Sequence, residues 1–396
     1  MLPNRRIRMN EGRLDMNDKL KKSMFDFSPS RRDVVKGATA LAGAAAIGGI
    51  VPKASAADED TLTLLTWPGH ADAHVVGPFE EATGVKIVPK EYVGGEAMLS
   101  LLQQSPPGTY DVILTGNAYI EMMRDAGFIE KLDPADYPIE DFWPEFQNFP
   151  THWLDGDLYS VMVSYGFIGM AYNTNIFTAE DLRSYAALWS DKAAGKVGHF
   201  DWYLPSMGVL SIYNGNENPY DIDEAQFEKL KETLFSLRPQ VAGFYAFAGL
   251  FGAMTGEEAW VVPGIGEWLT ILMRKDGLPV DMTIPDEGGL QWTESLSIAT
   301  GSKKQELAKK FVQYMSSPEG LIREATKPAY NASIPSIPGW EKLNAERPED
   351  AVMLRHEFDK PNVIDDIRAG KINVRYLPKQ QSVEDWNEAW TEYKNL

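Results

Sequence analysis

The most regular stretch of the chain, residues 61–114, reads TLTLLTWPGHADAHVVGPFEEATGVKIVPKEYVGGEAMLSLLQQSPPGTYDVIL. Three short apolar runs begin within it at Thr61, Val85 and Tyr110. The intervals between these runs leave room for one amphipathic helix each, which we place at 78–83 and 97–104. Short apolar strands that alternate with helices are typical of βαβ units, in which the strands lie parallel. This stretch therefore predicts an α/β lobe with a parallel sheet.

The middle of the chain, from about residue 173 to 289, repeats this alternation less regularly. We expect strands at 197–200 and 259–262 and helices at 224–237 and 267–275. The tail differs from both, with amphipathic helices at 303–315 and 383–393 on either side of proline-rich loops. No long flexible linker separates the two predicted lobes, so the chain should pass between them through short extended segments that can act as a hinge.

The composition bounds the classes of function. The chain has 396 residues and a formal charge of −19, with 44% hydrophobic residues, 24% charged residues and no cysteine. At about 150 residues per domain, this length allows two globular units that each bury a core. The acidic balance excludes general binding to nucleic acid or to anionic membranes, because both need a basic surface. The lack of cysteine excludes disulfides, thiolate metal sites and cysteine nucleophiles.

Residues 1–56 differ in charge from the rest. Up to Lys53 the chain carries 11 basic and five acidic residues, so this part has a charge of +6 and the remainder −25. A basic segment with the pair Arg31-Arg32 precedes an apolar run at 37–51, and Ala54-Ser55-Ala56 follows it. This layout is typical of a removable export signal, and the paired arginines resemble the twin-arginine pattern. A membrane anchor is the alternative, but the run spans only about 22 Å of a hydrocarbon core of about 30 Å.

Common catalytic signatures are missing from the sequence, which holds no GxSxG, GxxxxGK[ST] or HExxH motif. The one segment with metal-like spacing is His70-Ala71-Asp72-Ala73-His74, where both histidines would share a helix face and Asp72 could support them. A solvated helix start is the alternative, and the lack of a third ligand nearby favours it. We therefore expect neither an enzyme nor a bound metal or cofactor.

A second group of side chains gathers at the ends of the predicted strands, where open α/β sheets bind ligands. In chain order these residues are Trp67, Asn117, Tyr119, Asp201, Trp202, Glu267, Trp268, Trp292 and Glu294. A single tryptophan is more often part of a core, but the recurrence of indoles at strand ends favours a shared site. Aromatic faces beside carboxylates suit an organic cation, because the ring quadrupole and the anion both attract positive charge.

Two motifs carry a resemblance to a known family: Phe79–Lys86, FEEATGVK, and Glu287–Leu296, EGGLQWTESL. Shorter segments such as YDVI at 110–113 agree with it. From about Leu62 to Tyr330 the chain resembles the periplasmic spermidine/putrescine-type solute-binding proteins of ABC importers. The resemblance implies the two-lobed type II periplasmic binding protein fold. This is an α/β fold in which each lobe is a mixed sheet flanked by helices and a ligand cleft lies at the hinge.

The implied layout divides the chain into five parts. These are a removed signal at 1–56, lobe one at 57–164, lobe two at 165–290, a return to lobe one at 291–335 and a C-terminal helical segment at 336–396. The C-terminal segment is expected to pack on lobe two or on the hinge.

The resemblance also implies roles for individual residues. Trp292 matches a tryptophan that stacks on the polyamine chain, and Glu294 matches a carboxylate that holds an amino group. Asp201 falls near another amine-binding acid. Trp67 aligns with the tryptophan after the first strand, and Tyr330 lies near a loop that lines the cleft.

The chain departs from the family's pattern at four positions. Gly266 stands where a second stacking tryptophan is expected, and a serine, a tyrosine and an acid are replaced by Gly116, Ala118 and Pro205. Glu267 and Trp268 are candidates to compensate for these losses.

The expected function is that of a periplasmic receptor, soluble after signal removal and monomeric. It would capture a cationic amine, such as spermidine or putrescine, and deliver it to the membrane subunits of an ABC permease. Because the chain differs from the family's pattern at four positions, the alternative ligand is a zwitterion, a quaternary amine or an opine-like amino compound. The alternative from a different class is a secreted metal-dependent hydrolase that uses His70, Asp72 and His74.

Overall fold

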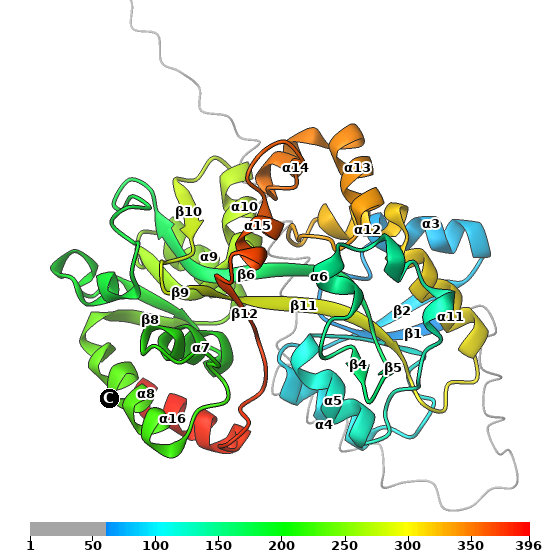
Figure 1. The fold of residues 1–396 in the computed structure, drawn as a ribbon, viewed down its shortest axis with the longest axis horizontal. Coiled ribbons are helices and arrows are strands. Elements are labelled where there is room, and N and C mark those ends of the chain that lie inside the picture. Colours follow the sequence, from blue (N-terminus) through cyan, green and yellow to red (C-terminus); the bar gives the residue numbers. More distant parts are fainter. Residues whose placement is uncertain (1–60) are drawn as a thin grey trace, which may run out of the picture. The chain divides into compact units, whose positions relative to one another are not determined.

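A sheet of ten strands runs through the computed structural model, which describes residues 61–396. The main order is β2-β1-β3-β11-β6-β9-β7-β8, with β10 beside β6 and β12 beside β11 (Figure 1). The strands are β1 (Thr61–Thr66), β2 (Lys86–Glu91), β3 (Val112–Thr115), β6 (Val161–Asn173), β7 (Val197–Phe200), β8 (Val241–Tyr245), β9 (Val261–Gly266), β10 (Val280–Thr283), β11 (Gly289–Ile298) and β12 (Ile372–Val374). A separate hairpin joins β4 (Trp153–Leu154) to β5 (Asp157–Leu158). The predicted export signal at 1–56 lies outside the described residues.

Helices cover the sheet in two groups. On the side of β1 to β3 lie α3 (Ala73–Thr83), α4 (Gly95–Gln104), α5 (Ile120–Asp125), α6 (Pro144–Gln147), α11 (Gln305–Ser316) and α12 (Pro318–Ala325). On the side of β7 to β9 lie α7 (Tyr203–Tyr213), α8 (Glu224–Ser236), α9 (Phe247–Thr255) and α10 (Glu267–Lys275). The tail adds α13 (Ile337–Glu346), α14 (Pro348–Met353), α15 (Val363–Arg368) and α16 (Val383–Asn395). We call the first group with its strands lobe one and the second lobe two.

Parallel pairing defines the sheet of each lobe. In lobe one β1 pairs in parallel with β2 and β3, and in lobe two β7 pairs in parallel with β8 and β9. The apolar runs at 61, 85 and 110 lead into β1, β2 and β3, which confirms the predicted βαβ rhythm. Each lobe has its own core, one around Leu62 and Phe311 and the other around Leu210 and Trp386. A two-lobed α/β fold follows.

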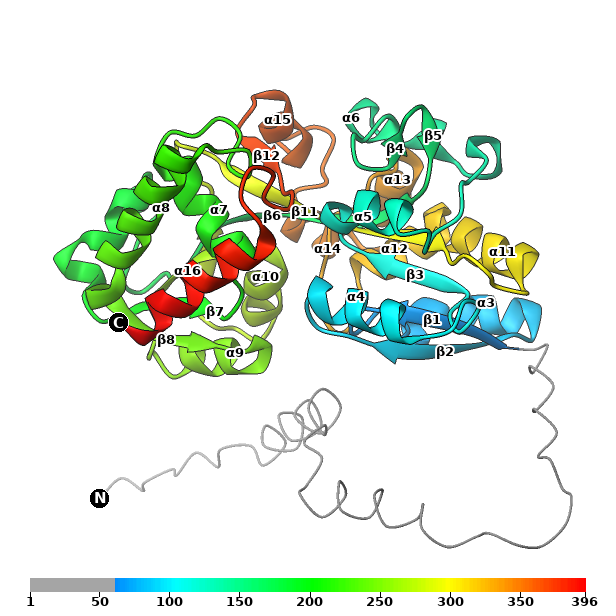
Figure 2. The same cartoon turned by 90° about the horizontal axis from the view of Figure 1, so that it is seen from below.

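Two long antiparallel strands, β6 and β11, connect the lobes (Figure 2). They pair from Val161 opposite Leu296 to Ile168 opposite Leu290, and every residue of β6 is buried. The early part of β6 packs in the core of lobe one, whereas Ile168 belongs to that of lobe two. The residue pattern of 161–173 does not predict a strand, because a strand covered on both faces shows no apolar–polar alternation.

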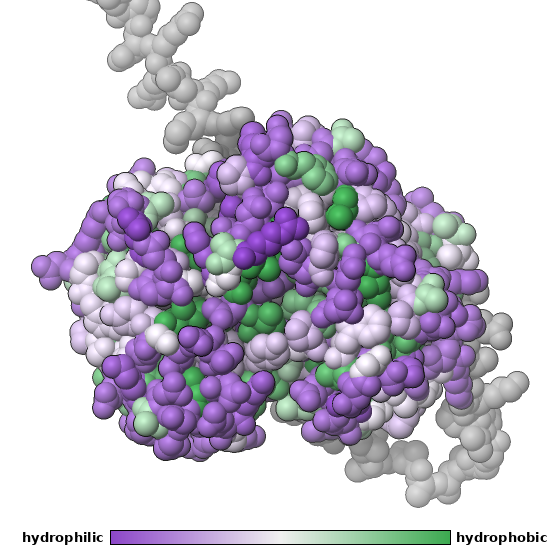
Figure 3. Space-filling view, viewed as in Figure 1, coloured by the Kyte–Doolittle hydropathy of each residue, from purple (hydrophilic) through white to green (hydrophobic). Residues whose placement is uncertain are grey.

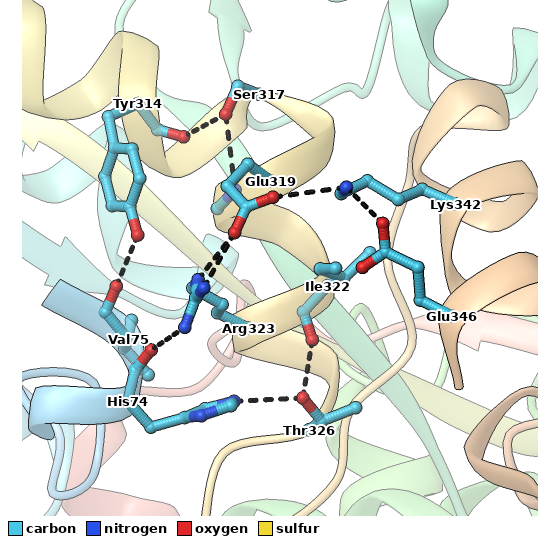
Figure 4. Close-up of polar contacts among 11 residues, drawn as sticks. His74, Val75, Tyr314, Ser317, Glu319, Ile322, Arg323, Thr326, Lys342 and Glu346 are labelled. Atoms are coloured by element: carbon cyan, nitrogen blue, oxygen red, sulfur yellow. Dashed lines mark hydrogen bonds and ion pairs between the residues drawn. The ribbon is translucent and has the colours of Figure 1, made fainter. Parts of the chain in front are cut away.

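Helix α3 begins five residues before its predicted start at Pro78. Asp72 caps the helix by accepting a hydrogen bond from His74 N, and Pro78 lies inside it. A proline cannot donate to the carbonyl four residues earlier, which here is that of His74. Arg323 of α12 donates to this carbonyl over 3.0 Å instead and also bonds Glu319 (Figure 4). A contact from a distant helix therefore permits a proline where the local rule predicts a boundary.

The tail is divided between the lobes. Helix α13 packs on α12, and its buried Trp340 lies in the core of lobe one, stacked on His356 at 4.0 Å. Helix α16 packs on α7 and α8, with its buried Trp386 stacked on Phe227. The expectation that all of 336–396 packs on lobe two or the hinge is therefore wrong for α13. Apolar side chains of the tail can be buried against the core of either lobe. The composition of the tail does not specify which of the two cores they contact.

The face of the molecule seen in Figure 3 is mostly hydrophilic. Figure 3 shows purple residues over both ends of one face, while green residues appear in its middle. No helix within residues 61–396 is long and apolar enough to cross a membrane.

The divided tail leads to a stability prediction. Trp340→Ala should lower the free energy of unfolding by about 3–5 kcal/mol, because it leaves a large cavity and removes the bond from Nε1 to the Ile334 carbonyl. Amide exchange should then rise in lobe one, whereas Trp386→Ala should raise it in lobe two. Urea titration and hydrogen exchange measure both effects, and the exposed Glu341→Ala on the same helix is the control. A loss below about 1 kcal/mol for Trp340→Ala would contradict its place in the core.

Candidate functional site

A cavity of about 740 Å³, including space open to solvent, lies between lobe one and lobe two beside β11. Aromatic rings from both lobes form much of its wall: Trp67, Tyr92, Tyr119, Phe200, Trp202, Phe247, Trp268, Trp292 and Tyr330. Such walls exclude water and strengthen any charge interaction within the cavity.

Seven of the ten residues predicted for the site line this cavity: Trp67, Tyr119, Trp202, Trp268, Trp292, Glu294 and Tyr330. They come from segments far apart in the sequence, and the parallel sheets bring their strand ends together. The other three, Asn117, Asp201 and Glu267, do not line the cavity. Each of the three has a protein partner that accounts for its position.

Asn117 holds two segments together beneath the cavity. Its side chain donates to the Arg375 carbonyl over 2.7 Å, and its backbone N–H donates to the Thr293 hydroxyl over 3.0 Å. The residue is almost fully buried. Asn117 therefore fixes the chain after β12 against β11, rather than facing a ligand.

Asp201 serves helix α16. Its carboxylate forms an ion pair with Lys394 at 2.8 Å and accepts a hydrogen bond from Trp390 Nε1 at 3.1 Å. The expected amine-binding acid is thus already neutralised by the tail. Its sequence neighbour Trp202, the N-cap residue of α7, does line the cavity.

Glu267 supports the connecting strand β6 from the first turn of α10. Both of its carboxylate oxygens accept from the Phe167 N–H, at 2.9 and 3.1 Å. Burial raises the pKa of this carboxyl to about 8, although the hydrogen bond from the Phe167 N–H lowers it in part. A Cβ at Gly166 would lie 2.1 Å from Glu267 Oε1 and 2.5 Å from the Trp292 ring. Glu267 and Trp292 therefore pack on β6 at a place where only glycine fits.

Glu294 is the only acid among the described residues that line the cavity. The pairing of β11 with β6 shifts register between Glu294 and Ser295, and such a bulge changes where a side chain points. Burial raises the pKa of the Glu294 carboxyl to about 8, and Arg375 and Lys327 offset part of this rise. Within residues 61–396, no group makes a hydrogen bond to its Oε2. A buried carboxyl of this kind favours a cation that can pair with it.

The aromatic wall is held in place by ring contacts. Trp268 stacks on Phe247 with centroids 5.0 Å apart and planes at 9°. Tyr330 meets both Trp268 and Trp292 edge-on at 6.3 Å. Tyr330 therefore sits between the two indoles and fixes their separation.

A buried ionic cluster supports Tyr330 from behind. Its hydroxyl lies 2.8 Å from His70 Nε2, and His70 Nδ1 lies 2.9 Å from Glu324 Oε2. Lys327 pairs with Glu324 at 3.0 Å and lies 4.0 Å from the centre of the Tyr330 ring. Burial lowers the pKa of His70, and the neighbouring Glu324 carboxylate offsets part of this shift. The cluster makes the wall rigid on the side of lobe one.

The histidine pair that we considered for a metal is separated in the structure. His70 contacts Tyr330 and Glu324 in the buried cluster. His74 Nε2 instead lies 3.1 Å from the hydroxyl of Thr326, the C-cap residue of α12 (Figure 4). Asp72 caps α3. No group of three metal-ligating side chains occurs in the part of the chain that the structure describes. His70, Asp72 and His74 therefore do not form the metal site that the hydrolase alternative needs.

The cavity residues that were not predicted include three with large side chains, Tyr92, Phe247 and Arg375. Tyr92 directly follows β2, so the strand-end rule could have found it. Phe247 is the first residue of α9, which follows β8 in the chain, and β8 was not predicted. Arg375 follows β12 in the tail, where the sequence offered no signal at all.

Comparisons with known proteins agree with this fold. Residues 74–347 match the family model described as bacterial extracellular solute-binding protein. A spermidine/putrescine-binding periplasmic protein of Haemophilus influenzae is 29% identical over 265 residues, which are 66% of this chain and 72% of that protein. One from Escherichia coli K12 is 27% identical over 320 residues, or 79% and 87% of the two chains.

A solved structure shows the same architecture. The putative spermidine/putrescine ABC transporter protein from Listeria monocytogenes superposes with a TM-score of 0.71 at 21% identity, over 85% of this chain and 99% of that one. This likeness confirms the two-lobed type II periplasmic binding protein fold that the resemblance implied. Because the family model spans more than half of its length, the chain belongs to the bacterial extracellular solute-binding proteins.

Proposed function

We propose that this protein is the substrate-binding component of an ABC importer and captures an organic amine. The observation that carries the proposal is Glu294, a buried acid with a raised pKa in a cavity walled by aromatic rings. The relatives named for spermidine and putrescine support polyamines as the first compounds to test. In this role the protein binds and releases its ligand unchanged and is not an enzyme.

Binding would join the two lobes. The ammonium group would pair with Glu294 on β11, while Trp268 and Trp292 would cover the adjoining methylene groups. Contacts to Trp67 on lobe one and Trp202 on lobe two would favour a closed arrangement over an open one. The membrane permease would then recognise the closed form.

The proposal includes a place of action. Export through the twin-arginine signal at 1–56 would put the mature protein in the periplasm as a monomer, where its relatives act according to their names. The partners would be the ligand and the membrane subunits of the permease.

A second candidate cargo keeps the fold and changes the ligand. A zwitterion, a quaternary amine or an opine-like amino compound would also place its positive nitrogen at Glu294. The guanidinium of Arg375, which lines the same cavity, favours a ligand that also carries negative charge.

The role of Glu294 can be tested by substitution. Glu294→Gln should weaken putrescine binding by about 30-fold or more, which corresponds to about 2 kcal/mol, because the buried ammonium loses its counter-charge. Isothermal titration calorimetry measures the change. Glu287→Gln is the control, since this acid lies just before β11 and accepts a bond from Ser184 outside the cavity. Equal affinity of the wild type and Glu294→Gln would remove Glu294 from the site.

Binding should also depend on pH. The ligand pairs with the ionised carboxylate, so it must displace the proton that Glu294 holds below a pKa of about 8. Affinity for putrescine should therefore rise by up to tenfold per unit from pH 6 to 8 and flatten above it.

Calorimetry at pH 7 in phosphate and in Tris measures this coupling directly. The proton released on binding is taken up by the buffer, so the apparent binding enthalpies should differ by the difference between the ionisation enthalpies of the two buffers. Glu294→Gln should abolish this difference. Identical enthalpies in the two buffers for the wild type would show that Glu294 is already ionised in the free protein.

A further inference from the structure

Arg375 reaches the cavity from the tail, beyond the residues that match the family model. It follows β12, which pairs in parallel with β11. Its N–H donates to the Gln291 carbonyl over 3.1 Å, and its carbonyl accepts from the Asn117 side chain over 2.7 Å. Bonds on both sides thus fix the backbone of Arg375 and direct its side chain to the cavity.

The guanidinium is enclosed but unpaired. Arg375 is 6% exposed, and its Cζ lies 4.9 Å from the centre of the Trp202 ring. A Cβ at Gly116 would lie 3.3 Å from Nη2, so the glycine leaves the guanidinium its space. Across residues 61–396, the guanidinium has no ion pair and no hydrogen bond, and its Nε is buried without a partner.

The groups that face Arg375 do not neutralise it. Glu294 interacts with it electrostatically, yet the two form no direct ion pair. Tyr119 and Tyr220 also interact with its charge, and burial raises the pKa of both phenols, so they are neutral. The face of Trp202 offsets only part of the cost of burying a cation.

A buried arginine of this kind is suited to a planar anion. Its guanidinium presents parallel N–H donors whose spacing matches the two oxygens of a carboxylate. An unpaired buried charge lowers the stability of the free protein, so its presence in the cavity is explained by a ligand that pairs with it.

We propose that Arg375 binds a carboxylate of the ligand while Glu294 binds its amine, so the preferred cargo is a carboxylated amine. This inference rests on the proposed function and narrows its substrate class. One acid and one guanidinium line the cavity, and a zwitterion satisfies both. A diamine satisfies Glu294 alone and brings its second ammonium group near Arg375.

Matched ligands test the proposal. Putrescine and 4-aminobutyrate have the same length, and one ammonium group of the first is a carboxylate in the second. Spermidine and N-(4-aminobutyl)-β-alanine form a longer pair of the same kind. Calorimetry on the full mature protein should show the carboxylated member binding at least tenfold tighter in one or both pairs.

Substitution should reverse this preference. Arg375→Gln should weaken the carboxylated amine by about 30-fold or more and leave the diamine unchanged or tighter. Arg375→Lys should restore part of the loss, because it keeps the charge without the planar donors. Lys379→Gln is the control, since it removes a positive charge from the same segment at an exposed position outside the cavity.

Thermal unfolding of the ligand-free protein separates this role from a structural one. Arg375→Gln should keep or raise Tm, because the variant no longer buries an unpaired charge. A lower Tm with equal losses for both members of a pair would overturn the proposal. Diamines that bind more tightly than their carboxylated partners in the wild type would overturn it while leaving the proposed function intact. If the wild type bound no compound of either pair, both proposals would fail.

Discussion

The antiparallel pairing of β6 with β11 is the contact on which the rest of the structure depends. These two strands belong to the cores of both lobes, and β11 also carries Trp292 and Glu294. Gly166 on β6 lies opposite Trp292, and the missing side chain lets the indole and Glu267 pack against the strand. The same pair of strands therefore joins the lobes and presents the centre of the cavity.

Much of the fold could be predicted from local pattern. The strands β1, β2 and β3 follow from apolar runs at regular intervals, and α8, α10 and α16 from helical periodicity. Strand β6 could not be predicted, because both of its faces are covered and alternation is lost. The start of α3 was misplaced because Arg323, 249 residues after His74 in the chain, satisfies the carbonyl that Pro78 cannot.

The residues of the cavity could be predicted where they follow the ends of strands. They could not be predicted where contacts with distant segments decide which way a side chain points. Trp67, Trp202 and Trp268 follow strands, and the parallel sheets bring them together. Asn117, Asp201 and Glu267 are instead turned to partners on other segments: the Arg375 carbonyl, Lys394 and the Phe167 N–H. Arg375 itself is brought in by the pairing of three residues of β12 with β11, which is too short a strand to be read from sequence.

Strand β11 is paired along both edges near Gly289–Gln291, with β6 on one side and β12 on the other. Such a three-stranded ribbon resists torsion, since twisting one lobe against the other would shear hydrogen bonds at both edges. Bending across the ribbon disturbs fewer of them. We therefore expect the lobes to move against each other by bending of this ribbon, of which β11 with its cavity residues Trp292 and Glu294 is a part.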